Sequence, residues 1–538
     1  MRLASADELR AMVPEQLAEL SVASALLLLV AVYALYSLLP DWRRLPPRMK
    51  VLWPALQGQF QLDDWGPVEC LRQAAQKHGE IFRICLPGQS CTFLIGRRAC
   101  ECWFKQKNDV FNPAGAYRSF MKPVFGPRVV YDAPSEKMAS QLRFVKHGLS
   151  QDMMRQHPAK LVREVREYCQ AEQGAWLEAG RCELYHMTSE MIINTASRCI
   201  LGDEIRDTVH KEFARYYVDL EQGISHLSFF ASWLPTPAHR RRDAARKKLS
   251  EIFTPIIQGR RKKTGAPMDP KDFLQVLVEG EYNDGTKPDD EAIVGLLVAA
   301  LFGGQHTSNI TSSWLLMMIH SPENRKTLLP RLLKEQEEVF AKHGGELTYE
   351  GLLEMTLLEN CIKETLRMFP PLVVLMRKCF ASVEYEATDG QTYTIPKGDL
   401  VCISAAVQNR LPELFDQPDV FNPDRHGGDR STWVAEGREP ETTFPPPSEK
   451  DTRGGMLVDT SSSWIPFGGG RHACVGRYFA FLQIKTITSS LFRHYDMEWE
   501  DPNWQPKVDF SQIVATPPPC NMKMKRRPDA EIVGGAMF

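Results

Sequence analysis

Residues 466–476 read Pro-Phe-Gly-Gly-Gly-Arg-His-Ala-Cys-Val-Gly, which presents one thiol, Cys474, in a glycine-rich loop. The apolar run that follows, from Tyr478 to Ile484, has helical spacing and puts the thiol near a helix N-terminus. A thiolate in an apolar pocket needs backbone N–H donors, and glycines let the main chain approach the sulfur without Cβ atoms in the way. This pattern predicts a stabilised thiolate, with a buried structural cysteine as the alternative.

The residues around this thiol favour a metal ligand over a structural cysteine. Phe467, Gly470, the basic His472 and Gly476 occur together with Cys474 in one short loop. A thiolate is a strong donor that pushes electron density through haem iron toward bound oxygen and favours cleavage of the O–O bond. We therefore predict that Cys474 ligates a haem iron, and that Phe467, Gly470 and His472 belong to the cofactor-binding loop.

This loop resembles the one in the cytochromes P-450, the haem-thiolate monooxygenases. The resemblance covers roughly residues 45 to 525. It implies the cytochrome P-450 fold, which is mainly α with a small β region, and haem b held between a long central helix and the cysteine loop. It also implies the use of O2, with electrons delivered from NADPH through a cytochrome reductase.

Length and composition favour one large catalytic unit. The chain has 538 residues, no internal repeat and no low-complexity linker near its middle, so we expect a catalytic domain at 51–525 and a tail at 526–538. The formal net charge of -2 gives no electrostatic reason to expect nucleic acid. Of the thirteen cysteines, only Cys100 and Cys102 form a close pair, and no second pair at zinc-ligand spacing accompanies them. This cysteine usage fits a reduced, cytosol-facing environment.

An uncharged, mostly apolar stretch at residues 21–39 is long enough to cross a bilayer at about 1.5 Å rise per residue. The preceding residues 1–20 are acidic and no small-residue cleavage site follows, which argues against a signal peptide; a core helix is the other alternative. Residues 40–50 combine basic side chains with Pro46 and Pro47 and form the expected hinge, on the cytosolic side. The pattern predicts a single-pass anchor with the catalytic domain on the cytosolic side. The resemblance implies that the membrane is that of the endoplasmic reticulum, with residues 1–20 lumenal.

Helical patterns dominate the rest of the chain. A long helix is expected over residues 289–320, and its apolar centre predicts burial through the middle of the molecule. A second helix should end at Phe369, before two prolines, while alternating stretches at 393–395 and 400–404 predict strands. Residues 426–463 are rich in Gly, Pro, Ser and charge, which predicts an exposed insertion.

The midpoint of the long helix reads Gly303-Gly304-Gln305-His306-Thr307. Two glycines and a hydroxyl allow a helix to open locally, so that water or O2 can accept a hydrogen bond from Thr307. Histidine titrates near neutrality and can pass a proton, although His306 in a core helix without any role is the alternative. Because His306 stands where most cytochromes P-450 have an acid, and His472 where most have arginine, the chain resembles the sterol 14α-demethylases.

That resemblance implies an acidic partner for His306. Glu221, in Leu-Glu-Gln-Gly-Ile-Ser-His, occupies the position of this partner. The expected pair of Glu221 and His306 delivers protons, together with Thr307, and breaks when the entrance of the site moves.

A further ion pair is expected from Lys-Glu-Thr-Leu-Arg at residues 363–367. Glu364 and Arg367 lie about one helical turn apart, a spacing that usually marks a solvated surface salt bridge. The resemblance implies instead that they bind Arg425 and brace the haem-binding loop, which is a structural role.

Two haem propionates need cations or hydroxyl donors in a buried site. The resemblance implies that this role falls to Tyr117, Tyr131, Arg377 and His472. A basic residue that some relatives carry is missing at Ala139 and Leu142, although Arg143 is adjacent.

Rigid apolar walls for a flat polycyclic ligand are expected from six residues, namely Phe120, Phe125, Tyr131, Gly303, Leu375 and Met376. Phenylalanine at position 120 resembles plant and some protozoan enzymes, which implies a preference for sterols with a single C4 methyl. The spacing from Tyr117 to Phe125 resembles the animal and fungal enzymes, so both preferences stay open.

The implied reaction is three successive oxygenations of a sterol 14α-methyl group in sterol biosynthesis, with azole inhibitors binding the same iron and the enzyme acting as a monomer. One alternative is a haem-thiolate monooxygenase that acts on a fatty acid or a foreign compound. The other is a haem-binding sensor that does not turn over. Retention of Thr307 argues against the sensor, because ligand binding alone does not require a proton-guiding hydroxyl.

Overall fold

The computed structural model describes residues 45–49, 66–86, 88–208, 212–224, 226–263, 272–426, 463–510 and 514–527. The predicted anchor at 21–39 lies outside the described residues, as do residues 427–462 of the predicted insertion and the tail from 528 onward. The predicted end points of the insertion need correction. His426 and Ser463 belong to the folded body, because both side chains are buried there.

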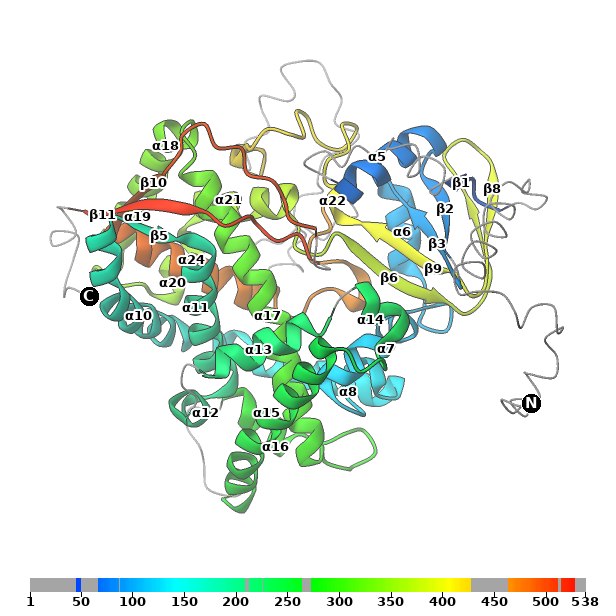
Figure 1. The fold of residues 1–538 in the computed structure, drawn as a ribbon, viewed down its shortest axis with the longest axis horizontal. Helices are drawn as coiled ribbons and strands as arrows, with labels where there is room; N and C mark the ends of the chain where they lie inside the picture. The colour runs from blue at the N-terminus through cyan, green and yellow to red at the C-terminus, as the bar shows by residue number, and fades with distance from the viewer. Residues whose placement is uncertain are drawn as a thin grey trace, which may run out of the picture.

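Helices form most of the described structure (Figure 1), which confirms the predicted fold class. The α-helices are α5 (Gly66–His78), α6 (Arg97–Lys105), α7 (Pro113–Phe125), α8 (Ser135–Gly148), α9 (Gln151–Arg155), α10 (His157–Ala179), α11 (Leu184–Ala196), α12 (Asp203–Thr208), α13 (Glu212–Gln222), α14 (His226–Ala231), α15 (Pro237–Lys262), α16 (Phe273–Glu279), α17 (Asp290–Ile319), α18 (Asn324–Thr327), α19 (Leu329–Lys342), α20 (Tyr349–Glu354), α21 (Thr356–Met368), α22 (Ala405–Gln408) and α24 (Arg477–His494). Short non-α turns are η1 (Val130–Asp132), η2 (Ser197–Leu201), η3 (Pro423–His426) and η5 (Gly470–His472).

The β structure is confined to three small sheets in the described part of the chain. The largest has the order β1-β2-β3-β9-β6-β4, in which β1 pairs with β2 and β3 with β9 in parallel, and the other pairs are antiparallel. The others are β10-β11-β5 and β7-β8. The strands are β1 (Arg48–Met49), β2 (Ile81–Leu86), β3 (Gln89–Leu94), β4 (Phe111–Asn112), β5 (Arg181–Glu183), β6 (Val374–Cys379), β7 (Val383–Glu386), β8 (Thr392–Ile395), β9 (Leu400–Ser404), β10 (Tyr495–Trp499) and β11 (Asn521–Arg526).

Helix α17 runs through the middle of the molecule, as predicted from its apolar centre (Figure 1). Asp289 caps its N-terminus, because its carboxylate accepts a hydrogen bond from the backbone N–H of Ala292 at 2.8 Å. The helix packs against α7, α11, α15, α21 and α24. It is the one helix in the described ranges that is long and apolar enough to cross a membrane, and its burial identifies it as a core helix.

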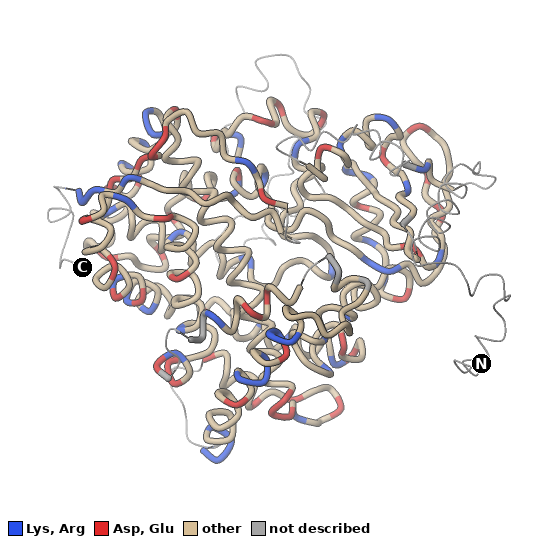
Figure 2. The backbone as a smooth tube through the Cα atoms, viewed as in Figure 1, with Lys and Arg blue, Asp and Glu red and all other residues tan. Residues whose placement is uncertain are grey.

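Charges of both signs are interspersed along the outer helices (Figure 2), which agrees with the small net charge. The large sheet lies at one side of the molecule, and α7 packs against its strand β6 (Figure 1). The site therefore forms where three units meet: the central helix α17, the strand β6 with helix α7, and the cysteine loop before α24.

Candidate active site

The cysteine loop has the backbone that its glycines predict. The N–H of Cys474 donates to the carbonyl of Phe467 at 2.9 Å, which closes the loop just before α24. Gly468 and Gly470 adopt positive φ angles of 66° and 61°, at which a residue with a side chain would be strained. A Cβ on Gly470 would also lie 2.9 Å from the backbone oxygen of Phe104. Glycine is therefore required at position 470 both by conformation and by close packing.

The thiol of Cys474 faces an internal space. Its side chain has accessible surface, yet surrounding protein raises its pKa through burial. Backbone N–H groups of Gly476 and Arg477 and the charge of Arg477 oppose that shift and favour the thiolate. A metal cation at the sulfur would favour the thiolate further, so these surroundings suit Cys474 as a metal ligand.

The midpoint of α17 borders open space. Gly303 is exposed although most of the helix is buried, and no heavy atom lies within 4 Å of the positions that Cβ atoms would take on Gly303 and Gly304. The hydroxyl of Thr307 donates to the carbonyl of Gly303 at 2.9 Å. The local opening expected here is absent, because this hydrogen bond stays inside the helix, which runs unbroken from 290 to 319.

The predicted pair of Glu221 and His306 is in contact. Nδ1 of His306 lies 3.1 Å from Oε1 of Glu221, which joins α13 to α17. Burial raises the pKa of Glu221 to about 7 and lowers the pKa of His306. Nε2 of His306 is buried and finds no hydrogen-bond partner within the described ranges. The pair therefore holds a carboxyl that titrates near neutrality and an imidazole with one free nitrogen.

A buried arginine, Arg377, lies near two residues of the cysteine loop, the exposed Arg471 and the partly buried His472. Arg377 stacks on Trp103, with Cζ 3.7 Å from the ring centroid, and one of its nitrogens donates to the carbonyl of Trp103 at 2.8 Å. Its Nε and Nη2 are buried without a partner in the part of the chain that the structure describes. Burial and then the charge of Arg471 lower the pKa of Arg377 to about 10, while burial, Arg377 and Arg471 lower that of His472 to about 4. Among the described residues no carboxylate forms a salt bridge with Arg377, so its two unpartnered nitrogens suit an anionic ligand.

Two tyrosines complete this side of the site. The ring of Tyr117 stacks on that of Tyr131 at 5.0 Å, and its hydroxyl accepts a hydrogen bond from the N–H of Met376 at 3.0 Å. Burial, followed by the charge of Cys474, raises the pKa of Tyr131 to about 12. The two tyrosines therefore lie together next to strand β6, which carries Arg377. The binding of a cofactor by Tyr117, Tyr131, Arg377 and His472 stays a prediction.

The family model for cytochrome P450 matches residues 46–524. The chain belongs to the cytochrome P450 family. This family comprises haem-dependent monooxygenases that use O2, so the predicted oxidoreductase class is confirmed.

Known relatives narrow the resemblance. The chain is 38% identical to a sterol 14-demethylase of Arabidopsis thaliana (88% of this chain, 89% of the relative). It is 36% identical to a lanosterol 14-alpha demethylase of Bos taurus (86% and 84%), and 35% identical to an obtusifoliol 14-alpha demethylase of Triticum aestivum (84% and 91%). The solved structure of a retinoic acid bound cyanobacterial CYP120A1 matches with a TM-score of 0.70 at 20% identity, over 90% of this chain and 99% of that one, which supports the fold. The expected resemblance to the sterol 14α-demethylases is confirmed.

The residues of this cytochrome P450 chain fit a bound haem. Three features lack a partner among the described residues: the thiol of Cys474, which has accessible surface, two nitrogens of the buried Arg377, and the core helix where it borders open space at Gly303. Haem b offers an iron for the sulfur of Cys474 and propionate carboxylates for the guanidinium of Arg377. These groups are the reason why the residues fit a bound haem.

Arg143 does not replace the missing basic contact. Its guanidinium donates to Oδ1 of Asn283 at 3.0 Å and to the carbonyl of Glu281 at 3.1 Å, in the segment that follows α16. Its guanidinium is therefore held by the segment after α16, and a basic contact for that propionate stays unassigned.

The carboxylate of Glu364 is fully buried and is bound by two guanidinium groups and one imidazole. Nε of Arg367 lies 2.8 Å away, and Nε of Arg425 and Nε2 of His426 each lie at 2.9 Å. Burial opposes ionisation, but hydrogen bonds from Arg367 and His426 hold the pKa of Glu364 well below its usual value. The alternative of a solvated surface pair is wrong, and His426 is a partner that the sequence patterns did not predict.

This cluster reaches the cysteine loop through one asparagine. Arg367 donates to the backbone carbonyl of Asn409 at 3.0 Å, and the side-chain oxygen of Asn409 accepts from the N–H of Ile465 at 3.2 Å. Ile465 directly precedes the loop. The route from Glu364 to the loop is therefore continuous through hydrogen bonds.

The predicted apolar walls lie on four elements, α7, η1, α17 and β6. On α7, the ring of Phe120 packs against those of Tyr117 at 5.7 Å and Phe229 at 4.3 Å. Phe125 packs at 5.8 Å against Phe302 of α17. On β6, Leu375 lies 3.7 Å from the position of a Cβ on Gly468, and the neighbouring Met376 holds Tyr117.

Sequence patterns missed Phe229, Phe302 and Trp103. Phe302 lies at the end of the apolar centre of α17, so helical periodicity could have placed it one residue before Gly303. Phe229 and Trp103 carry no such signal, because their partners lie far away along the chain.

Proposed function

We propose that this chain is a sterol 14α-demethylase. It removes the 14α-methyl group of a sterol precursor in three successive oxygenations, releases the carbon as formate and leaves a C14 double bond. The observation that carries the proposal is the thiol of Cys474, which has accessible surface although protein surrounds it, in a chain that also has a buried guanidinium with unpartnered nitrogens at Arg377 and an open helix face at Gly303. The similarity to lanosterol and obtusifoliol demethylases supports the substrate class.

The chain would hold haem b through residues on three sides. Cys474 would ligate the iron within the loop of Phe467 and Gly470, while the propionates would bind Tyr117, Tyr131, Arg377 and His472. Haem with a thiolate ligand supplies reductive activation of O2. Apolar surroundings keep water away from the reacting methyl group and strengthen each polar contact.

Protons are handled by three side chains. The hydroxyl of Thr307 lies at the open face of α17, and the carbonyl of Gly303 holds it in place. His306, the preceding residue, connects through Nδ1 to Glu221 on α13, whose side chain is partly exposed. A carboxyl that titrates near neutrality can take up a proton from solvent and pass it on through the imidazole.

The sterol would lie between aromatic and aliphatic walls. These walls are formed by Phe120, Phe125, Tyr131, Leu375 and Met376, and Gly303 leaves the space needed for the ring system. Rigid side chains orient a flat ligand at low entropic cost, so few polar contacts are needed to bring the methyl group to the reacting position.

The membrane and the electron donor complete the proposal. Residues 21–39 would anchor the enzyme in the endoplasmic reticulum membrane as a single span, with the catalytic domain in the cytosol as a monomer. An NADPH-dependent cytochrome reductase on the same surface would supply electrons. Azole inhibitors would compete with the sterol through a nitrogen that binds the same metal.

Reconstitution tests the function. The purified full chain is combined with an NADPH-dependent cytochrome reductase, lipid and lanosterol or obtusifoliol, and products are analysed by mass spectrometry. We expect loss of the 14-methyl carbon and release of formate. Turnover of fatty acids but of neither sterol would contradict the proposal, as would binding of sterol without any product.

The preference between sterols depends on Phe120. Its ring lies against Tyr117 and Phe229, where it narrows the wall of the site. We infer that the chain favours a sterol with one C4 methyl. A competition between a 4,4-dimethyl and a 4-monomethyl sterol measures the ratio of kcat/KM, and Phe120→Leu should shift that ratio toward the 4,4-dimethyl substrate. An unchanged ratio would remove Phe120 from the determinants.

A further inference from the structure

The turn that follows α6 packs against the cysteine loop. Phe104, near the end of α6, fills the space beside two loop glycines: a Cβ on Gly469 would lie 3.0 Å from its ring, and a Cβ on Gly470 would lie 2.9 Å from its carbonyl oxygen. Four residues further along the chain, Oδ1 of Asn108 lies 2.7 Å from Nε2 of His472. A side-chain amide therefore holds the one imidazole of this loop in place.

This contact decides what the other ring nitrogen of His472 can do. Nδ1 has no hydrogen-bond partner among the described residues. A neutral imidazole has one N–H and one acceptor nitrogen, so the role of Nε2 fixes the role of Nδ1. If Nε2 donates to the amide oxygen, Nδ1 is left as an acceptor. A carboxylate, which also only accepts, then gains no hydrogen bond from this imidazole.

The opposite arrangement suits an anionic ligand. The oxygen and nitrogen of a side-chain amide are nearly equal in size, so the amide of Asn108 occupies the same space after a half-turn about its last bond. Its Nδ2 then donates to Nε2 of His472, and the N–H of the imidazole lies on Nδ1. Because the hydrogen bond at one nitrogen sets the tautomer of a histidine, Asn108 can prepare His472 to bind a carboxylate.

We propose that Asn108 is a positioning residue for the cofactor: its Nδ2 donates to Nε2 of His472, which places the N–H of the imidazole on Nδ1, where it can donate to a haem propionate. The inference rests on the proposed contact between His472 and a propionate, and it is independent of which substrate the enzyme oxidises. Asn108 acts through His472 and not by contact with haem.

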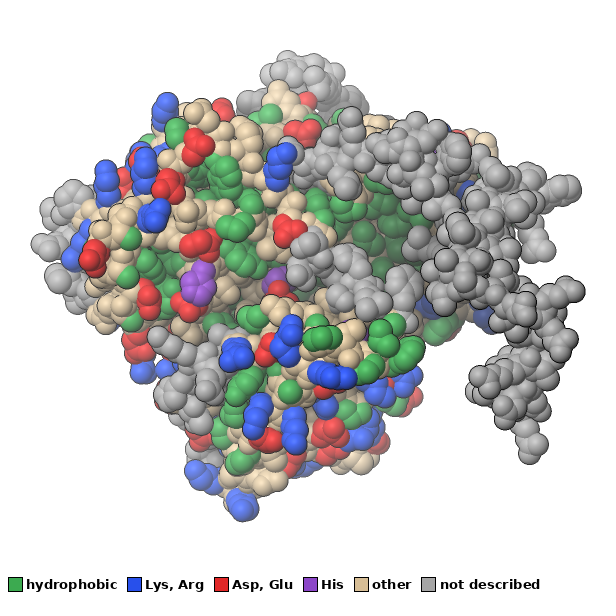
Figure 3. All heavy atoms as spheres, viewed as in Figure 1, with side chains coloured by type: hydrophobic (Ala, Val, Ile, Leu, Met, Phe, Trp, Pro, Cys, Tyr) green, Lys and Arg blue, Asp and Glu red, His purple; other side chains and the backbone are tan. Residues whose placement is uncertain are grey.

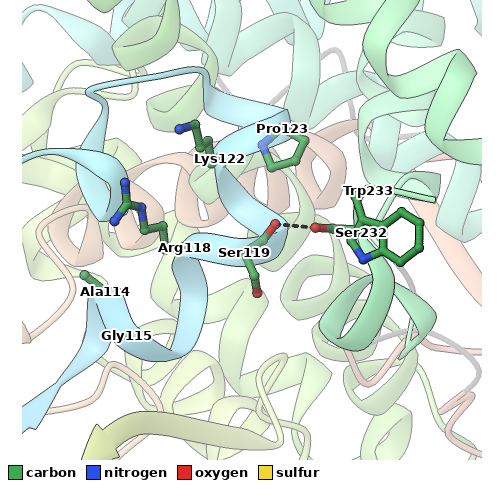
Figure 4. A pocket seen from close by; sticks show the side chains of 8 residues that line it. All are labelled: Ala114, Gly115, Arg118, Ser119, Lys122, Pro123, Ser232 and Trp233. Carbon is green, nitrogen blue, oxygen red and sulfur yellow. Dashed lines mark hydrogen bonds between the residues drawn. The ribbon is translucent and has the colours of Figure 1, made fainter. Parts of the chain in front are cut away.

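The turn that carries Asn108 is held by its backbone. The N–H of Phe111 donates to the carbonyl of Lys107 at 2.8 Å, and the carbonyl of Asn108 accepts from Nδ2 of Asn112 at 3.0 Å. Asn112 in turn caps α7, because its Oδ1 accepts from the N–H of Gly115 at 3.1 Å, in the first turn of that helix (Figure 4). Substitution of the side chain of Asn108 should therefore leave the turn and α7 folded.

The outer surface near α7 does not include this contact. A groove of about 490 Å³ is lined by residues of α7 and by Ser232 and Trp233, and none of these described lining residues belongs to the turn of Asn108 (Figure 4). Charged side chains of both signs are mixed on the face of the molecule that Figure 3 draws. Contacts close to His472, and not a broad surface field, therefore determine which of its nitrogens carries the hydrogen.

The experiment measures how fast haem leaves the purified full chain. The haem-loaded protein is mixed with an excess of apomyoglobin, and the transfer of haem is followed by visible absorbance. Neither sterol nor reductase is present, so the result does not depend on turnover. In His472→Ala, haem should leave at least about threefold faster, because a hydrogen bond to a charged group is lost. An unchanged rate would contradict the propionate contact and the inference together, whereas the sterol reaction is tested separately by reconstitution.

Two substitutions of Asn108 test the tautomer. Asn108→Leu removes the donor to Nε2, and Asn108→Asp offers a carboxylate that only accepts, which keeps the N–H on Nε2. We expect both to accelerate haem loss about threefold to tenfold, with the aspartate variant at least as fast as the leucine variant. The midpoint reduction potential should fall in both, because a propionate without its N–H donor keeps more negative charge near the iron and favours the ferric state.

Gln106→Leu is the matched control. The amide of Gln106 lies in the same segment but meets Sγ of Cys102 at 3.8 Å, so its loss should leave the rate of haem transfer within about twofold of the parent and the potential unchanged. Far-ultraviolet circular dichroism of all variants should match the parent, because the backbone contacts of the turn are untouched.

His472→Ala provides the decisive background. Without the imidazole, Asn108→Leu and Asn108→Asp should each alter haem loss by less than about twofold, since no tautomer remains to be set. The proposal is refuted if Asn108→Asp slows haem loss, if the rate or the potential is unchanged in both Asn108 variants, or if their effects are equally large in the His472→Ala background.

Discussion

Replacement of Glu221 by glutamine tests the proton pair most directly. Glutamine keeps an oxygen that can accept a hydrogen bond from Nδ1 of His306, which lies 3.1 Å away, but it cannot titrate. If the pair delivers protons, product formation should fall at least about tenfold, since positioned acid–base groups contribute roughly 10²- to 10⁴-fold. Oxidation of NADPH should continue, so the yield of product per NADPH should fall.

The same change has a calculable effect on stability. Burial raises the pKa of Glu221 from its usual 4.5 to about 7, a shift of about 2.5 units. At about 1.36 kcal/mol per unit this amounts to roughly 3.4 kcal/mol, and partial exposure and contact with His306 reduce it to about 2 kcal/mol. Between about pH 4.5 and 7 the folded protein binds more protons at this site than the unfolded chain, so stability falls as pH rises through this window.

Above about pH 7 the wild type carries the full penalty of an ionised buried carboxylate, and the glutamine variant does not. We therefore expect Glu221→Gln to raise the free energy of unfolding by about 2 kcal/mol near pH 8 and by well under 1 kcal/mol near pH 5. Denaturant titrations at both pH values measure this difference. Asp219→Asn is the matched control, because Asp219 lies on the same helix but faces Arg241 at 3.5 Å. Unchanged product yield per NADPH in Glu221→Gln, with a stability difference independent of pH, would refute the relay.

Three further substitutions test the rest of the site. Cys474→Ala should abolish turnover and remove the absorbance of the reduced carbon monoxide complex that marks thiolate ligation, while the helix content in circular dichroism stays unchanged. A retained thiolate spectrum would identify another ligand. Glu364→Ala leaves buried guanidinium groups without a carboxylate, so we expect a loss of about 3–5 kcal/mol of stability and of haem in the purified protein, whereas full haem content would exclude the bracing role. Gly303→Ala should fold normally and weaken sterol affinity, because its Cβ enters the open space where the sterol is expected. A Cβ on Gly295 would instead lie 2.3 Å from the backbone of α7, so Gly295→Ala should lower the melting temperature. Equal melting temperatures of the two variants would contradict this packing.

Local patterns predicted the framework well. The long helix starts at its predicted cap, Asp289, and strands β8 and β9 cover residues 393–395 and 400–404 as expected. These features depend on periodicity, capping and proline positions within one short window of sequence. The cysteine loop was predictable for the same reason, because its glycines and its thiol are neighbours in the chain.

Contacts between distant residues were predictable only where a family resemblance supplied them. The pair of Glu221 and His306 joins two helices, and neither residue alone indicates the other. Trp103 under Arg377, and Phe229 against Phe120, are fixed by tertiary packing that no local pattern encodes. The unbroken helix at Thr307 differs from the expected opening, because a threonine hydroxyl can bond within its own helix as readily as to a ligand.

Satisfied and unsatisfied polar groups separate structure from function in this molecule. Glu364 and Arg377 are both buried charges, but Glu364 accepts hydrogen bonds from Arg367, Arg425 and His426, whereas two nitrogens of Arg377 have no partner among the described residues. An unpaired buried charge destabilises a fold, and a paired one need not. Glu364 is therefore satisfied within the described structure, whereas the two unpartnered nitrogens of Arg377 suit an anionic ligand. Two other groups are also costly for the fold alone. The accessible thiol of Cys474 inside the fold suits a ligand, and the raised pKa of Glu221 suits a group that takes up and releases a proton.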